Sequence, residues 1–240
     1  MGQEITQDQL KSLEHRAQRI CNRLARSETQ RPIAVEFAGS PKSGKSSTID
    51  TIVHFFKRMG FRVFAPTEGA SKRTPEQLRK DRAAFNVWTV NYAISQLLSA
   101  YYDDSRSDLI ILDRGCFDSV AWNELQRKKD VMGENEAKVI RDFALHPMWA
   151  GFISKLYLFT CEPEVSLERE TAATLTTLEG RTMNRETLSE LLREYRELRD
   201  SLNTYPLMVI DTTAPGTPQE SGYKVAEDIV QIWEEKLSMA

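Results

Sequence analysis

Apolar positions along the chain alternate between short continuous runs and segments with helical spacing. Apolar runs bounded by polar residues predict five strands, over Ile33–Ala38, Phe61–Ala65, Leu109–Leu112, Lys155–Thr160 and Leu207–Ile210. Strands that are apolar throughout and separated by helices are typical of a parallel sheet buried on both faces. We therefore predict an α/β fold, a three-layer sandwich in which helices cover both faces of a five-stranded parallel sheet.

Helical spacing predicts the elements between and after these strands. They are Ser46–Met59, Pro75–Asp103, Phe117–Gln126, Glu134–Ala144, Glu186–Ser201 and Gly222–Leu237. One more amphipathic helix, over about residues 6–27, precedes the first strand and carries an apolar face that includes Leu13 and Ile20. This helix either packs on the side of the domain or forms a dimer or partner surface. We divide the chain into an N-terminal helical extension (1–30) and one domain (31–240).

Composition narrows the function classes. The chain has 240 residues, 40% hydrophobic and 28% charged, which suits a single globular core. A net charge of −3 argues against a general nucleic-acid binder but leaves room for a small anionic substrate. The polar N-terminus and the lack of a run of roughly 20 apolar residues predict a cytoplasmic protein without a membrane segment. The three cysteines and three histidines are scattered, which predicts no disulfide or zinc chemistry.

A glycine-rich motif of the form G-x-x-x-x-G-K-S follows the first predicted strand and opens a predicted helix. With the next serine, it consists of Gly39, Ser40, Pro41, Lys42, Ser43, Gly44, Lys45, Ser46 and Ser47. In such a P-loop, glycines let backbone N–H groups point at phosphate oxygens, and the helix start adds its positive end. Lys45 would reach the β- and γ-phosphates and Ser46 would ligate Mg²⁺. We therefore predict a P-loop NTPase fold that binds ATP and Mg²⁺.

A carboxylate at the end of a neighbouring strand would complete the magnesium site. Asp113 ends the predicted strand Leu109–Leu112 and is the candidate, because ligands collect at the carboxyl ends of parallel strands. Asp211 ends a later strand and would border the nucleotide base or cap a turn. The metal ligands predicted from sequence are therefore Ser46 and Asp113.

The segment Asp113–Trp122 (DRGCFDSVAW) resembles the Asp-Arg-Tyr…Ser…Ala-Tyr element of thymidylate kinases and the Asp/Glu-Arg-Ser element of the related deoxynucleoside kinases. Pro66–Gly69 (PTEG) stands where thymidylate kinases have Arg-Glu-Pro-Gly. Cys161–Arg169 is similar to the Pro-Glu-x-x-Leu-x-Arg segment that leads into the lid of both families. The resemblance covers about residues 32–238. It implies an ATP-dependent nucleoside or nucleotide kinase with a lid over about 168–186, and these kinases are commonly homodimers.

The resemblance also implies roles for individual residues. Glu68 would accept the proton of an attacking hydroxyl or orient the acceptor, and Arg114 would bind a phosphate oxygen. The catalytic candidates are Lys45, Glu68, Asp113, Arg114, Arg169, Arg181 and Arg185. The substrate-binding candidates are Glu68, Arg82, Phe85, Trp88, Asn91 and Arg114. Simpler alternatives remain: Phe85 and Trp88 also fit a core stripe, Glu68 a turn, and Arg181 and Arg185 solvated charges.

The departures from the family pattern all touch the acceptor site. Gly115 replaces the aromatic residue of thymidylate kinases, the arginine of the Arg-Glu-Pro-Gly loop is absent, and no clear glutamine stands where deoxynucleoside kinases read the base. Three hypotheses follow: a nucleoside or nucleoside-monophosphate kinase, a P-loop kinase of another small acceptor, or a catalytically weak nucleotide-dependent switch. A GTPase is disfavoured, because Thr160–Pro163 stands where an N/T-K-x-D element would read guanine.

Overall fold

A parallel five-stranded sheet forms the centre of the computed structural model, which describes residues 5–26, 32–66, 74–103, 106–174, 178, 180–202 and 205–239. Its spatial order is β2-β3-β1-β4-β5, and every neighbouring pair is parallel. The strands are β1 (Ile33–Gly39), β2 (Val63–Phe64), β3 (Leu109–Asp113), β4 (Ile153–Thr160) and β5 (Leu207–Asp211). The predicted α/β class and parallel sheet are confirmed.

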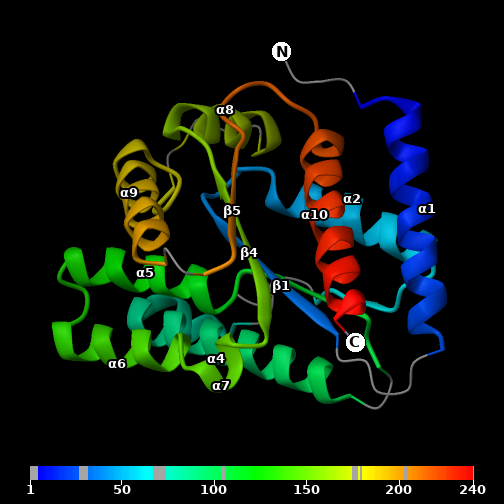
Figure 1. The fold of residues 1–240 in the computed structure, drawn as a ribbon. Coiled ribbons are helices and arrows are strands. Elements are labelled where there is room, and N and C mark those ends of the chain that lie inside the picture. The colour runs from blue at the N-terminus through cyan, green and yellow to red at the C-terminus, as the bar shows by residue number, and fades with distance from the viewer. Residues whose placement is uncertain are drawn as a thin grey trace.

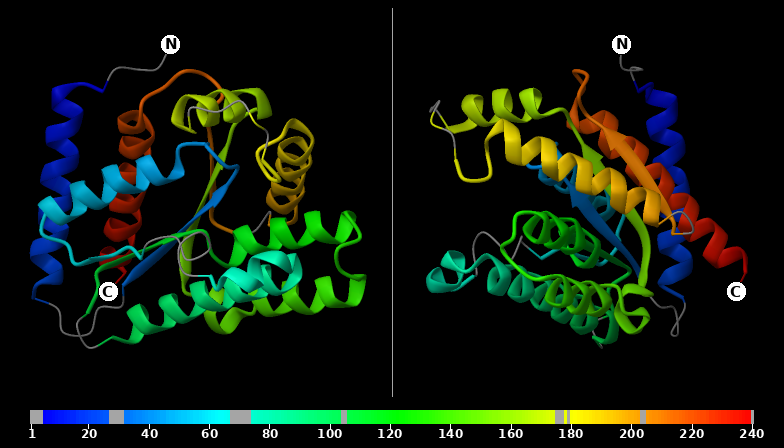
Figure 2. Two further views of the ribbon diagram at one scale, coloured as in Figure 1. Left: turned by 180° about the vertical axis from the view of Figure 1, so that it is seen from behind. Right: turned by 90° about the vertical axis from the view of Figure 1, so that its left-hand side faces the viewer.

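Helices cover both faces of this sheet, as predicted (Figure 1). One face carries α1 (Gln7–Leu24), α2 (Lys45–Arg58) and α10 (Pro218–Ser238). The other carries α4 (Arg82–Tyr102), α5 (Cys116–Lys128), α6 (Glu134–Ala144), α7 (Pro147–Ala150) and α9 (Arg185–Ser201). The helix α8 (Pro163–Thr174) follows the carboxyl end of β4, and Figure 2 shows it alongside α9.

The central strand β1 explains why its sequence reads as a continuous apolar run. All seven of its residues are buried, and alternate side chains point to opposite faces. Val35 and Phe37 join the cluster under α1, α2 and α10, whereas Ala34 and Ala38 join the cluster under α4, α5 and α9. The exception is Glu36, an ionisable side chain in a fully buried strand.

The helix predicted over Pro75–Asp103 is broken in the structure. A short 3-10 helix, η1 (Glu76–Lys80), precedes α4, and the break lies at Asp81. The Asp81 backbone is extended (φ −102°, ψ 106°), and its carboxylate accepts a hydrogen bond from the Ala84 N–H at 3.0 Å. Aspartate at an N-cap satisfies an otherwise unpaired N–H donor of the first helical turn, which favours the start of a new helix at this point.

The apolar face of α1 packs within the chain. Four of its residues are buried in the cluster that includes α10, namely Leu13, Ala17, Ile20 and Leu24. Arg16 pairs with Glu227 and Glu234 of α10 beside this contact. Of the two alternatives given for this helix, packing on the side of the domain is the one that the structure shows. Within the described ranges, no helix combines the length and apolarity needed to cross a bilayer.

Leu13→Ala tests how much α1 contributes to the core. Leu13 is 2% exposed, so its truncation should lower the free energy of unfolding by about 2–4 kcal/mol through lost burial and a residual cavity. Leu10→Ala is the matched control, because Leu10 on the same helix is 42% exposed. Denaturant unfolding measures both, and equal effects would show that α1 docks only loosely.

Candidate active site

The P-loop lies where the carboxyl end of β1 meets that of β4. Gly39 has φ +132°, and a Cβ atom there would lie 1.8 Å from the carbonyl oxygen of Phe159. The next residue, Ser40, donates its N–H to the same carbonyl at 3.0 Å. Gly44 has φ +87° and precedes the first residue of α2. Both motif glycines are therefore required, the first by close packing and the second by backbone conformation.

Lys45 is folded over its own loop. Its side chain is buried, and its ammonium donates to the carbonyl oxygens of Gly39 at 2.8 Å and Ser40 at 2.7 Å, with the Ser43 hydroxyl at 3.4 Å. An ammonium has three donors, so a phosphate that enters the loop must replace one of these acceptors. The loop thus holds the lysine in place next to the phosphate position.

Ser46 and Asp113 meet across the gap between α2 and β3. The Ser46 hydroxyl donates to Oδ2 of Asp113 at 3.1 Å, and Asp113 pairs in register with Phe37 near the end of β1. Hydroxyl and carboxylate oxygens are suitable Mg²⁺ ligands, and Mg²⁺ commonly takes its remaining ligands from phosphate and water. In the part of the chain that the structure describes, no group of three or more His, Cys, Asp or Glu side chains could hold a metal by itself. The pair therefore fits a magnesium that arrives with the nucleotide.

A groove of about 820 Å³ runs from the P-loop to the segment after β5. Arg169 ties its two sides together, because its guanidinium donates to the Lys42 carbonyl at 3.1 Å and to the Thr212 carbonyl at 2.6 Å. Asp211 accepts from both the N–H and the hydroxyl of Thr213, at 2.8 and 2.6 Å, and so caps a turn beside the groove. The P-loop therefore lines one side of the groove and the segment after β5 lines the other.

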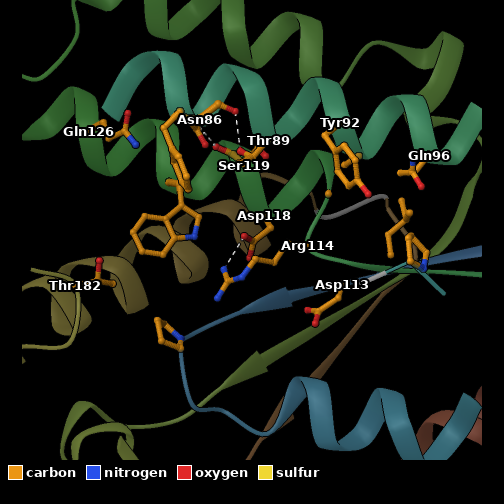
Figure 3. Close-up of a pocket in the computed structure, with 17 residues that line it drawn as sticks. Asn86, Thr89, Tyr92, Gln96, Asp113, Arg114, Asp118, Ser119, Gln126 and Thr182 are labelled. Carbon is orange, nitrogen blue, oxygen red and sulfur yellow. Dashed lines mark hydrogen bonds and ion pairs between the residues drawn. The ribbon is translucent and has the colours of Figure 1, made fainter. Parts of the chain in front are cut away.

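Asp118 connects three parts of the site, and the sequence analysis missed it. One carboxylate oxygen accepts from the Gly39 N–H at 3.0 Å and from the Tyr195 hydroxyl of α9 at 2.6 Å. The other pairs with the Arg114 guanidinium at 2.8 Å (Figure 3). Arg114 itself has a left-handed backbone, with φ +64°, which is uncommon for a residue with a side chain. Asp118 thereby fixes the orientation of Arg114 relative to the P-loop.

Glu36 explains the glycine that replaces an aromatic residue after Asp113-Arg114. Burial raises the pKa of this carboxyl from 4.5 to about 8, although backbone N–H groups at the start of α5 partly oppose the shift. A Cβ atom on Gly115 would lie 2.7 Å from Oε2 of Glu36. Glu36 therefore fills the space behind residue 115, and a larger side chain there would collide with it.

A second cavity, of about 280 Å³, lies between α4 and α5 above Asp113 and Arg114. Figure 3 shows Gln126 and Thr182 at one end and Tyr92 and Gln96 at the other, with Arg114 and Asp118 between them. Its further lining residues include Phe85, Asn86, Thr89, Ser119 and Trp122. Phe85 was predicted for this role. Four of the lining residues recur at helical spacing along α4, namely Phe85, Thr89, Tyr92 and Gln96. This spacing identifies cavity residues only once it is known which face of α4 points inward.

Other candidates for the acceptor site lie elsewhere. Trp88 and Asn91 are not among the described residues that line this cavity. Trp88 stacks on Tyr92 with ring centroids 5.4 Å apart, and the Asn91 amide donates to the Val87 carbonyl at 2.8 Å. Glu68 lies outside the described residues.

The remaining candidate arginines, from the long helix and the predicted lid, lie in different places. Arg82 and Arg181 line a third cavity, of about 370 Å³, which adjoins the second. The side chain of Arg185 is 73% exposed and pairs with Glu164. Arg185 is not among the described residues that line the three cavities. Arg114 remains the candidate arginine that lies at the centre.

Comparison with known proteins identifies the fold. No protein-family model and no curated protein matches this chain. Among solved structures, deoxyadenosine kinase from M. mycoides with bound dCTP has a TM-score of 0.59, with 14% identity over 82% of this chain and 98% of that one. The fold is that of deoxyadenosine kinase. The same enzyme with dCMP and dCDP gives a TM-score of 0.58, with 14% identity over 83% and 100% of the two chains. With dATP the TM-score is 0.58, with 12% identity over 82% and 98%.

This deoxyadenosine kinase fold agrees with the resemblance recognised in the sequence. The structural match extends over four-fifths of the chain at low identity, so it concerns the arrangement of helices and strands. The roles of individual residues therefore depend on the geometry of this chain itself.

Glu36→Gln should remove one source of pH dependence from the stability. The folded pKa of Glu36 lies near 8 and its ordinary value near 4.5, so the folded state holds a proton that the unfolded state releases between these values. The free energy of unfolding of the wild type should therefore fall as the pH rises from 5 to 8, by at most about 1.4 kcal/mol per pH unit from this group.

Denaturant unfolding at several pH values, compared between the two proteins, measures this effect. As the pH rises, the free energy of unfolding of the wild type should fall relative to that of Glu36→Gln. A constant difference across this range would contradict a raised pKa for Glu36.

Proposed function

We propose that this protein transfers the γ-phosphoryl group of ATP to a nucleoside or nucleoside monophosphate. The observation that carries the proposal is that the P-loop groove and the cavity between α4 and α5 meet at three shared residues, Pro41, Asp113 and Arg114. A donor in the groove and an acceptor in the cavity would therefore have their reacting ends at one place. Phosphoryl transfer depends mainly on such positioning and on charge neutralisation.

The residues at this junction suit the charge that develops during transfer. Arg114 offers a planar guanidinium with several donors, and its ion pair with the buried Asp118 holds it before substrate binds. Lys45 would bind the β- and γ-phosphates on the other side of the junction. Mg²⁺, when bound with ATP at Ser46 and Asp113, would neutralise phosphate charge.

The proton of an attacking hydroxyl needs a base. Glu68 is proposed for this role from the sequence resemblance alone. A carboxylate within hydrogen-bond reach of the acceptor hydroxyl would take the proton as the new bond to phosphorus forms. Arg169 would act from the donor side, because it lines the P-loop groove and contacts the P-loop carbonyl of Lys42.

Structures that share the fold support a deoxynucleoside or deoxynucleotide as the ligand class. The comparison structures hold dCTP, dATP, or dCMP with dCDP. The cavity here offers Phe85 and Trp122 as ring surfaces and Asn86, Gln96 and Gln126 as amides, which are the groups that stack on a base and read its edge. The hypothesis of a nucleotide-dependent switch was based on the extra N-terminal helix as a partner surface. The apolar face of that helix, α1, is buried against α10, so this argument for a switch no longer applies.

Lys45→Ala should abolish acceptor-stimulated ATP hydrolysis or transfer. With Mg²⁺ and a panel of deoxynucleosides and nucleoside monophosphates, at least one acceptor should accelerate conversion of ATP to ADP. Loss of the phosphate-binding ammonium should reduce this rate by about 100-fold or more. Lys57→Ala is the control, because Lys57 is an exposed lysine at the far end of the same helix. No stimulation by any acceptor would contradict the proposed function.

Asp113→Asn should raise the Mg²⁺ requirement. Replacing the carboxylate by a neutral amide weakens metal coordination, so the Mg²⁺ concentration for half-maximal rate should rise by roughly tenfold or more. Steady-state rates measured against Mg²⁺ at fixed ATP report this shift. An unchanged Mg²⁺ dependence would remove Asp113 from the metal site.

A further inference from the structure

The acceptor cavity continues into the third cavity described above, here called the basic chamber. The two share Phe85, Trp122, Gln126 and Thr182 as common walls. In Figure 3, Gln126 and Thr182 lie at the end of the acceptor cavity opposite Tyr92 and Gln96, and Asp113 lies well away from them. A ligand that reaches Asp113 with one end can therefore extend its other end into the basic chamber.

Cationic side chains gather in the basic chamber. Four of its ten lining residues are cationic, and no aspartate or glutamate is among the described residues that line it; the cations are Arg79, Arg82, Lys129 and Arg181. Lys129 forms an ion pair with Glu190, whereas Arg82 and Arg181 form no ion pair within the described residues. The whole chain carries a net charge of −3, so this concentration of cations in one cavity is local. Such a local positive potential attracts an anionic group.

Gln126 marks the boundary between the two cavities. Its side chain is 8% exposed, and its amide oxygen has no hydrogen-bond partner among the described residues. A buried polar atom without a partner is costly, and a ligand N–H or O–H at this point would remove the cost. The amide lines both cavities, so it would contact a ligand that spans them.

We infer that the acceptor carries a negative group, a phosphate or a carboxylate, at the end remote from the atom that receives the phosphoryl group. This inference rests on the proposed function and narrows its substrate class. The remote group binds at Arg82 and Arg181, the middle of the molecule lies between Phe85 and Trp122, and a donor on it meets Gln126. Arginine suits this task because its planar guanidinium binds both oxyanions in a bidentate manner.

Binding of matched neutral and charged ligands tests the inference. Calorimetry on the full chain, with ADP and Mg²⁺ present to fill the P-loop groove, would compare four probes: deoxyadenosine, its 5′-monophosphate, its 3′-monophosphate and N6-carboxymethyl-deoxyadenosine, whose carboxylate lies on the base, remote from the 5′-hydroxyl. At least one anionic probe should bind about tenfold more tightly than deoxyadenosine, since two arginines contact its charge. This preference should shrink as the salt concentration rises.

The double variant Arg82→Gln/Arg181→Gln should abolish the preference, bringing the anionic probe within about threefold of deoxyadenosine when both are measured on the variant. Arg58→Gln/Arg193→Gln is the matched control; it removes two exposed charges that line neither cavity and should keep the preference. Denaturant unfolding of both double variants and the wild type shows whether the variants are folded.

Three outcomes would overturn the inference. They are the absence of binding by every anionic probe, equal affinity for charged and neutral probes, and a preference that survives in the double variant and so belongs to Arg114. Turnover assays separate this inference from the proposed function. Turnover without an arginine-dependent preference would overturn the basic chamber alone, whereas arginine-dependent binding without turnover would support the chamber and reject the kinase.

Discussion

The carboxylate of Asp118 is the contact on which the geometry of the site depends. It lies buried at the start of α5 and binds the Gly39 N–H of the P-loop, the Tyr195 hydroxyl of α9 and the Arg114 guanidinium. These partners belong to separate elements of the sheet and its helical cover, so one side chain fixes the distance between the phosphate loop and the central arginine. A buried carboxylate without such partners would be strongly unfavourable, and its complete set of partners also makes the arrangement specific.

A second buried carboxyl, Glu36, lies on the strand that leads into the P-loop and receives the N–H of Asp118 at 2.9 Å. The two acids therefore share the start of α5, where the helix N-terminus favours negative charge. Their closeness also helps to keep Glu36 protonated, because a like charge raises the pKa of its neighbour. The Glu36 carboxyl occupies the space next to Gly115. This explains why the chain has glycine where the thymidylate kinase pattern has an aromatic residue.

The sheet, its parallel direction and the P-loop could be predicted because each depends on local sequence: apolar runs, turn residues and a motif with fixed spacing. The closeness of Ser46 and Asp113 could also be predicted, since the carboxyl ends of parallel strands meet at one edge of the sheet.

The break at Asp81 was missed because helical spacing continues across it and only the capping contact reveals the start of a new helix. Asp118, Tyr195 and the amides of the acceptor cavity were missed because their roles arise from contacts between distant segments. Trp88 and Asn91 have suitable chemistry, but the rotation of α4 turns Phe85 and Gln96 toward the cavity.

The packing of α1 on α10 has a consequence for how the chain folds. Arg16 and Glu227 are 211 residues apart in sequence, yet they touch across the contact that buries Leu13 and Ile20. A helix whose apolar side has no local partner stays exposed during synthesis until the distant segment emerges from the ribosome, and exposed apolar surface of this kind is what chaperones bind and what drives aggregation. The strands β1, β3 and β4 are neighbours at the centre of the sheet, and all three precede α10 in the sequence. Docking of α1 would then be a late step, and its rate would depend on when α10 is available.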